Sequence, residues 1–214
     1  MTARAAKEQP REPSIARAAA ALEEVYSAAN ARFYDGALPP VALTLAPAGR
    51  RNAYGWCTTA PVWSTADGSV KLVEVNMSAE HLHRPEAETV ATLLHEMVHV
   101  YHVQTGVKGT SRQNRYHNKR FQADALAHGL TCAHDERIGW SLTALNETAA
   151  AWLADLEYDR DGLTLARQSE GGGKKAKTVS SFRKHTCPTC GLTARTTRDA
   201  TLVCFDCEQV MSHE

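Results

Sequence analysis

The chain has 214 residues, of which 43% are hydrophobic and 22% are charged, and its formal net charge at pH 7 is zero. This length allows one globular domain of ordinary size together with a small module. Composition argues against a membrane protein, because no apolar run approaches about 18 residues, and against a secreted one, because residues 1–21 lack the apolar core of a signal peptide. We therefore expect a cytoplasmic protein, associated with the nucleoid if it is bacterial.

The N-terminal third predicts one helix followed by strands. Residues 1–14 are expected to be disordered. Apolar residues at helical spacing predict a helix over residues 15–35, which Gly36 ends. Three strand-like segments follow, at residues 41–45, 54–58 and 70–75. We expect these segments to form a small antiparallel sheet.

Three more helices are predicted downstream. The first covers about residues 85–102, with Pro85 near its first position and apolar residues every three or four positions. The second runs from about residue 118 to 128 and is closed by Gly129. One further helix is indicated by Leu142, Leu145, Ala149, Trp152, Leu153 and Leu156. This order of elements predicts an α+β domain with helices on one face of the sheet.

The helix predicted at 85–102 carries the sequence His95-Glu96-Met97-Val98-His99. Residues four positions apart share one face of a helix, so His95 and His99 could bind one metal ion with Glu96 beside it. This spacing is typical of hydrolytic zinc sites. Partly buried histidines without a metal are the alternative, but the surrounding helix pattern favours the metal site.

A hydrolytic zinc site needs a third protein ligand and leaves one position for water. His102 lies on the same helix, but about 10 Å along the axis from His95, which makes it a neighbour rather than a ligand. The extended motif HExxHxxGxxH is excluded, because Thr105 stands where its last histidine would be. Candidates from later segments are Asp124, Glu136 and His117. Of these we favour His117, at the start of the next predicted helix.

Four of the six cysteines form two CxxC pairs, Cys187 with Cys190 and Cys204 with Cys207. Thirteen residues separate the pairs, which is close to the spacing of known zinc sites. Four thiolates fill a tetrahedron, so this second zinc is predicted to be structural. We expect residues 185–214 to form a zinc ribbon whose metal supplies most of its folding free energy.

Two segments concentrate positive charge. Residues 168–184 contain three consecutive glycines and several lysines and predict a flexible basic linker. The segment from Lys108 to Arg120 has five basic residues and no acidic ones, and it includes the favoured third ligand. A solvated surface is the alternative, but two basic segments in such a chain fit a polyanion better. The expected partner of these segments is therefore a nucleic acid such as DNA.

The sequence also resembles a known family. LLHEMVHVYH, YHNKRF and ADALAHGL resemble segments of the SprT-like (Spartan-type) zinc metalloproteases, in which the third histidine opens the helix after the motif helix. The segment Leu22–Pro40 resembles the first helix of that family and its exit, and the four cysteines resemble the zinc ribbon of bacterial members. The family often has glycine after the third histidine, where this chain has Asn118.

The resemblance implies a zincin-type domain over residues 15–167. It implies a catalytic zinc held by His95, His99 and His117, with Glu96 as catalytic base. It also implies hydrolysis of peptide bonds in proteins bound or crosslinked to DNA, and hence a role in DNA–protein crosslink repair.

The residues themselves support the same mechanism, in which Glu96 accepts a proton as zinc-activated water attacks a peptide carbonyl. Tyr116 and His102 are both candidates for stabilising the oxyanion. One alternative is a non-enzymatic nucleic-acid-binding protein whose HExxH site is silent. Another is a hydrolase of small amides or esters, against which the basic segment argues.

Overall fold

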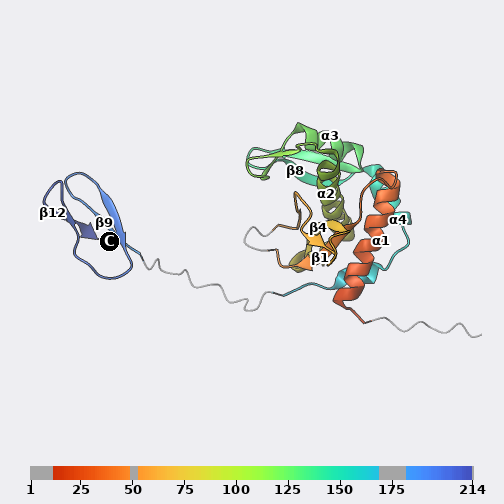
Figure 1. The fold of residues 1–214 in the computed structure, drawn as a ribbon, viewed down its shortest axis with the longest axis horizontal. Coiled ribbons are helices and arrows are strands. Elements are labelled where there is room, and N and C mark those ends of the chain that lie inside the picture. Colours follow the sequence, from red (N-terminus) through yellow and green to blue (C-terminus); the bar gives the residue numbers. More distant parts are fainter. Residues whose placement is uncertain (1–11, 49–52, 169–181, 214) are drawn as a thin grey trace, which may run out of the picture. The chain divides into compact units, whose positions relative to one another are not determined.

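The computed structural model describes residues 12–48, 53–168 and 182–213 (Figure 1). The chain divides into two compact units, Met1–Gln168 and Ser169–Glu214. The predicted disordered N-terminus and the predicted basic linker lie largely outside the described residues, so both stay predictions.

Two long helices form the centre of the first unit. Helix α1 (Ile15–Phe33) begins after Ser14, whose side chain accepts a hydrogen bond from the backbone N–H of Arg17. Helix α2 (Glu86–Thr105) has Glu86 and Glu88 in its first turn, where the helix dipole favours anions. It runs three residues past its predicted end, because Gly106, with φ of 71°, is the first residue suited to the left-handed cap.

The first sheet has the strand order β1-β4-β2, with β3 also paired to β4. Its strands are β1 (Val41–Ala46), β2 (Gly55–Cys57), β3 (Trp63–Ser64) and β4 (Lys71–Ser78). Strands β2 and β3 are antiparallel to β4, as predicted, but β1 is parallel to it. Strands β1 and β2 lie on opposite sides of β4 and run in opposite directions. The sheet is therefore mixed.

A second sheet, with strand order β5-β6-β8-β7, was not predicted. Its strands are β5 (Thr110–Ser111), β6 (Tyr116–His117), β7 (Leu130–Asp135) and β8 (Gly139–Leu145). The helix predicted from Leu142 onward is wrong in its first part, because Leu142 and Leu145 belong to β8. Helix α4 (Glu147–Asp155) begins only after Asn146, whose side chain accepts a hydrogen bond from the N–H of Ala149.

Helix α2 contacts both sheets, β2 and β4 on one side and β8 on the other (Figure 1). Leu93, Leu94, Met97 and Val98 are fully buried in the core that these elements share with α1. Helix α3 (Lys119–Ala127) agrees with its prediction, and the short helices η2 (Ala79–His81) and η3 (Arg160–Thr164) complete the unit. The α+β class is confirmed, and α2 is held firmly in the middle of it.

The second unit contains only short strands in its described part. Strands β10 (Thr193–Thr196), β9 (Arg183–Thr186) and β13 (Ser212–His213) form an antiparallel sheet, and β11 (Val203–Cys204) pairs with β12 (Gln209–Val210). Its small buried cluster consists of Cys187, Cys204 and Met211. So few apolar side chains bury little surface, as expected of a module that a metal stabilises. Within the described residues, no helix has the length and apolar content required to cross a membrane.

Candidate metal centre

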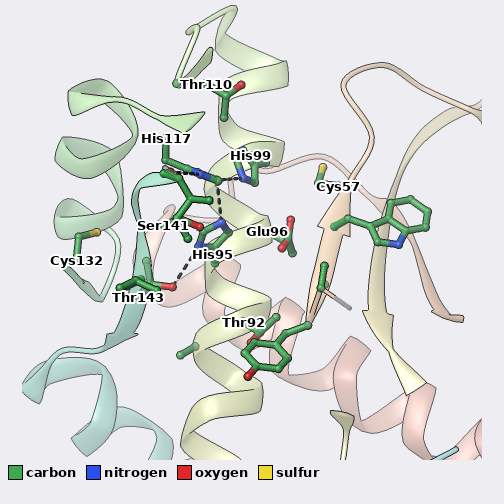
Figure 2. A pocket seen from close by; sticks show the side chains of 18 of the residues that line it. Cys57, Thr92, His95, Glu96, His99, Thr110, His117, Cys132, Ser141 and Thr143 are labelled. Carbon is green, nitrogen blue, oxygen red and sulfur yellow. Dashed lines mark hydrogen bonds between the residues drawn. The ribbon is translucent and has the colours of Figure 1, made fainter. Parts of the chain in front are cut away.

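Three histidines converge on one point in the first unit (Figure 2). His95 and His99 lie one turn apart on α2, and His117 ends β6. The Nε2 atom of His117 is 3.1 Å from Nε2 of His95 and 3.1 Å from Nε2 of His99. Zinc–nitrogen bonds of about 2.0–2.1 Å in a tetrahedron place two ligand nitrogens about 3.3 Å apart. The spacing of the three nitrogens therefore fits one zinc ion.

Burial keeps the three imidazoles neutral. Desolvation lowers the pKa of His95 to about 3 and that of His117 to about 4. It also lowers the pKa of His99 well below its ordinary value, with a further contribution from the neighbouring histidines. A histidine must be neutral to offer its lone pair to a metal. At neutral pH all three rings are in the form that binds a cation.

Hydrogen bonds on the far side of two rings orient them toward the shared point. Nδ1 of His95 is 3.1 Å from Oγ1 of Thr143, and Nδ1 of His117 is 3.4 Å from the carbonyl oxygen of Ile138. Contacts of this kind fix the ring orientation of metal-binding histidines. Gly139 makes the second one possible, because a Cβ atom there would lie 2.1 Å from the carbonyl oxygen of His117.

These supporting residues were missed by the sequence analysis because they lie in or next to β8, the strand that it did not predict. The signal was present, however. Leu130–Asp135 and Gly139–Leu145 are two short segments joined by a tight turn, and Gly139 has a φ of 71°. Recognising this hairpin would have predicted β8, the strand that carries Thr143.

Phe121 of α3 packs against all three histidine rings. Its ring centroid is 4.7 Å from that of His95, 5.0 Å from His99 and 4.4 Å from His117. Asn118 begins this helix, since its side-chain oxygen accepts hydrogen bonds from the N–H groups of the second and third residues after it. Glycine, which the family often has here, could not make this cap. Asn118 thus fixes the start of α3 directly after His117.

Glu96 lies on the side of α2 that faces Cys57 of β2 (Figure 2). Its side chain is 5% exposed, and burial raises the pKa of its carboxyl group to about 8. A Cβ atom on Gly55 would come within 3.2 Å of its Oε1, so β2 approaches this carboxyl group closely. A carboxyl group with a pKa near neutrality suits general acid–base catalysis, and a cation bound at the histidines would lower that pKa.

A cavity of about 1670 Å³ contains these groups. Its walls come from β2, α2, residues 106–110, Asn114, Arg115 and the β7–β8 hairpin. Among the described residues, the histidine group includes neither Asp124 nor Glu136, the other candidates for a third ligand. His102 lines the cavity and is bound to Asp124, whereas the hydroxyl group of Tyr116 is 3.1 Å from Nε2 of His134.

Residues 22–135 match the family model described as the SprT-like family. The chain belongs to the SprT-like family. The match includes the three histidines and Glu96, ends before β8, and agrees with a metalloprotease-type function. Neither the curated proteins nor the solved structures gave a match.

Beyond the SprT-like match, the four cysteines of the second unit form a separate group. Their four sulfur atoms all lie within 4.8 Å of one another, and Sγ of Cys190 is 3.7 Å from Sγ of Cys204. Zinc–sulfur bonds of about 2.3 Å in a tetrahedron give sulfur separations of about 3.8 Å. Backbone hydrogen bonds lower the pKa of Cys187 to about 7, whereas hydrogen bonds with the neighbouring thiols raise the pKa of Cys207 to about 12. The cluster is consistent with a zinc ribbon.

Zinc content provides the first test. We expect two zinc ions per full-length chain, and one after either His117→Ala or Cys187→Ser, because each substitution removes a ligand from a different site. Elemental analysis of gel-filtered protein measures this. A wild-type protein that carries a single zinc, lost only in Cys187→Ser, would contradict the histidine site.

The buried carboxyl group provides a second test. Since burial raises the pKa of Glu96 from 4.5 to about 8, the folded metal-free protein keeps a proton that the unfolded chain releases in this pH range. The contribution of Glu96 to the free energy of unfolding must therefore fall as pH rises through the range, by about 1.4 kcal/mol per pH unit at most, whereas the buried histidines contribute in the opposite direction in wild type and variant alike. In Glu96→Gln this loss disappears. Denaturant titrations of both chelator-treated proteins near pH 5 and near pH 8 measure this. The free energy of unfolding of Glu96→Gln minus that of wild type should be larger at pH 8 than at pH 5. The same difference at both pH values would contradict the raised pKa of Glu96.

Proposed function

We propose that this SprT-like protein is a zinc-dependent metalloprotease. The observation that carries the proposal is the histidine group itself. Three neutral imidazole nitrogens lie at separations that suit one zinc ion, and the buried carboxyl group of Glu96 stands on the wall of the same cavity. Three protein ligands leave a position open for chemistry, whereas the four-cysteine group leaves none.

In the proposed mechanism, His95, His99 and His117 would hold the zinc, which when bound activates a water molecule and polarises a substrate carbonyl. Glu96 accepts a proton from that water as the water oxygen forms a bond to the carbonyl carbon. The same carboxyl group then delivers the proton to the leaving amine as the peptide bond breaks. Thr143 and the carbonyl of Ile138 keep two of the rings in place throughout.

An edge strand beside the site supports a peptide substrate. In the described sheet β2 is an end strand that pairs only with β4, so one of its edges is free. Six consecutive residues, 54–59, line the cavity. An extended peptide can pair with such an edge through main-chain hydrogen bonds and would then pass the carboxyl group of Glu96. The cavity also exceeds the roughly 300–1000 Å³ of most small-molecule sites, which disfavours a small amide or ester.

A cation–aromatic cluster supports substrates that are bound to DNA. We use this name for Arg112, Tyr116, His134 and Trp140. The guanidinium of Arg112 lies 4.5 Å from the ring centroid of Tyr116, and the ring of His134 is 4.9 Å from that of Trp140. Two further basic residues of the same segment line the cavity, Lys108 and Arg115. Single-stranded DNA binds through phosphates on cations and bases on aromatic rings, and both are offered here.

Loss of the proposed base tests the catalytic mechanism. Glu96→Gln should keep two zinc ions but cleave a DNA-bound protein at least about 100-fold more slowly than wild type, because the amide cannot accept the proton. Cleavage is followed by gel electrophoresis, with and without added single-stranded DNA. Glu24→Gln, the same change on the exposed face of α1, is the matched control.

We expect added single-stranded DNA to raise the wild-type rate. Undiminished cleavage by Glu96→Gln would rule out this mechanism. Two bound zinc ions without any proteolysis would instead favour the nucleic-acid-binding alternative.

Salt dependence tests the DNA surface. Arg112→Ala should weaken single-stranded DNA binding and reduce the slope of log affinity against log salt by about 0.7, the value for one lost phosphate contact. Arg32→Ala removes the same charge from α1 and should leave the slope unchanged. Fluorescence anisotropy at several salt concentrations measures both. Equal slopes for wild type and Arg112→Ala would remove this cluster from the DNA-binding surface.

A further inference from the structure

A fourth histidine lies buried next to the three that converge. His102 is in the last part of α2, is 6% exposed, and its ring centroid is 6.4 Å from that of His99. Its Nε2 is 2.7 Å from Oδ2 of Asp124 on α3. Its Nδ1 is buried and has no hydrogen-bond partner among the described residues. An apolar side chain at this position would avoid the cost of burying that nitrogen.

On one side, the His102–Asp124 pair joins α2 to α3. Helix α3 carries Phe121, which packs against the three converging histidines and lies 6.0 Å from the ring of His102. The same helix begins directly after His117 and its neighbour Asn118. The hydrogen bond between His102 and Asp124 therefore fixes the segment that follows His117 against α2.

On its other side, the ring of His102 meets the backbone of Gly109. A Cβ atom on Gly109 would lie 2.2 Å from both Cε1 and Nδ1 of the ring, so only glycine fits against it. The carbonyl oxygen of Gly109 accepts a hydrogen bond of 2.9 Å from the N–H of Asn118, and Thr110 pairs with His117 between β5 and β6. The segment that precedes His117 in the sheet therefore also rests on His102.

We infer that His102, together with Asp124, is a positioning residue for His117. His95 and His99 are fixed by a long helix, but His117 stands on a strand of two residues and depends on what packs around it. His102 supports both the segment before His117 and the segment after it. Its Nε2 is occupied by Asp124 and its Nδ1 is buried against Gly109, so neither nitrogen is placed to stabilise an oxyanion. This inference rests on the proposed zinc site.

Zinc affinity tests the inference without reference to activity. The two zinc ions of the full-length protein are titrated against a chromogenic chelator, with the four-cysteine site as internal reference. Asp124→Ala should weaken the histidine site by about 10- to 100-fold and leave the cysteine site unchanged. Asp124→Asn, which keeps an oxygen acceptor for Nε2–H, should retain most of the affinity.

Asp159→Ala is the matched control. Asp159 also forms an ion pair, with Arg17, and its side chain is 30% exposed against 27% for Asp124. We expect this variant to lose thermal stability but to bind zinc like wild type. Equal loss of zinc in both alanine variants would overturn the inference, because general destabilisation would then explain it.

Two further outcomes are decisive. Unchanged zinc affinity in Asp124→Ala overturns the inference, including the case in which kcat alone falls. If Asp124→Ala does not fold, Gly109→Ala takes its place, since it pushes on the ring without removing a charge, and it should show the same selective loss. If the His117→Ala variant binds as much zinc as wild type, the proposed function is overturned as well. This result separates a failure of the proposed function from a failure of the inference about His102.

Discussion

The first unit depends on one constraint, the burial of three imidazoles and one carboxyl group around a single point. Desolvation there disfavours every charged form, which leaves the histidines neutral and the Glu96 carboxyl group protonated in the absence of a cation. Without a cation the ring nitrogens can only share protons with one another at 3.1 Å, whereas a bound cation would use the lone pairs of all three rings at once. The surrounding helices and both sheets serve to hold this otherwise costly group together.

The two candidate metal sites differ in the number and kind of their donor atoms, and this difference suits them to different roles. Four thiolates close the coordination of a zinc ion, and the module around them has almost no other core. Three imidazoles leave a position open and lie on a wide cavity inside a well-packed domain. The first arrangement stabilises a fold, and the second allows a substrate to reach the metal.

The sequence predicted what depends on local spacing. The motif helix, the start of α3 near residue 118 and the paired cysteines follow from patterns within a few residues, and each lies where it was expected. What failed depends on contacts between distant segments. The spacing of Leu142 and Leu145 mimics a helix, although both belong to β8, and the hydrogen bond between Thr143 and His95 spans 48 positions. The parallel direction of β1 likewise belongs to its pairing with the distant strand β4, which no local pattern encodes.

The contrast between a twenty-residue helix and a two-residue strand has a consequence for the metal-free protein. Helix α2 keeps His95 and His99 in place through its buried face, whether or not a cation is bound. The chain from Gly106 to Asn118 has few buried side chains, so its local opening costs much less than global unfolding. At the proposed zinc site, exchange of the metal would therefore proceed through this segment alone, with His117 as the ligand that leaves first and returns last.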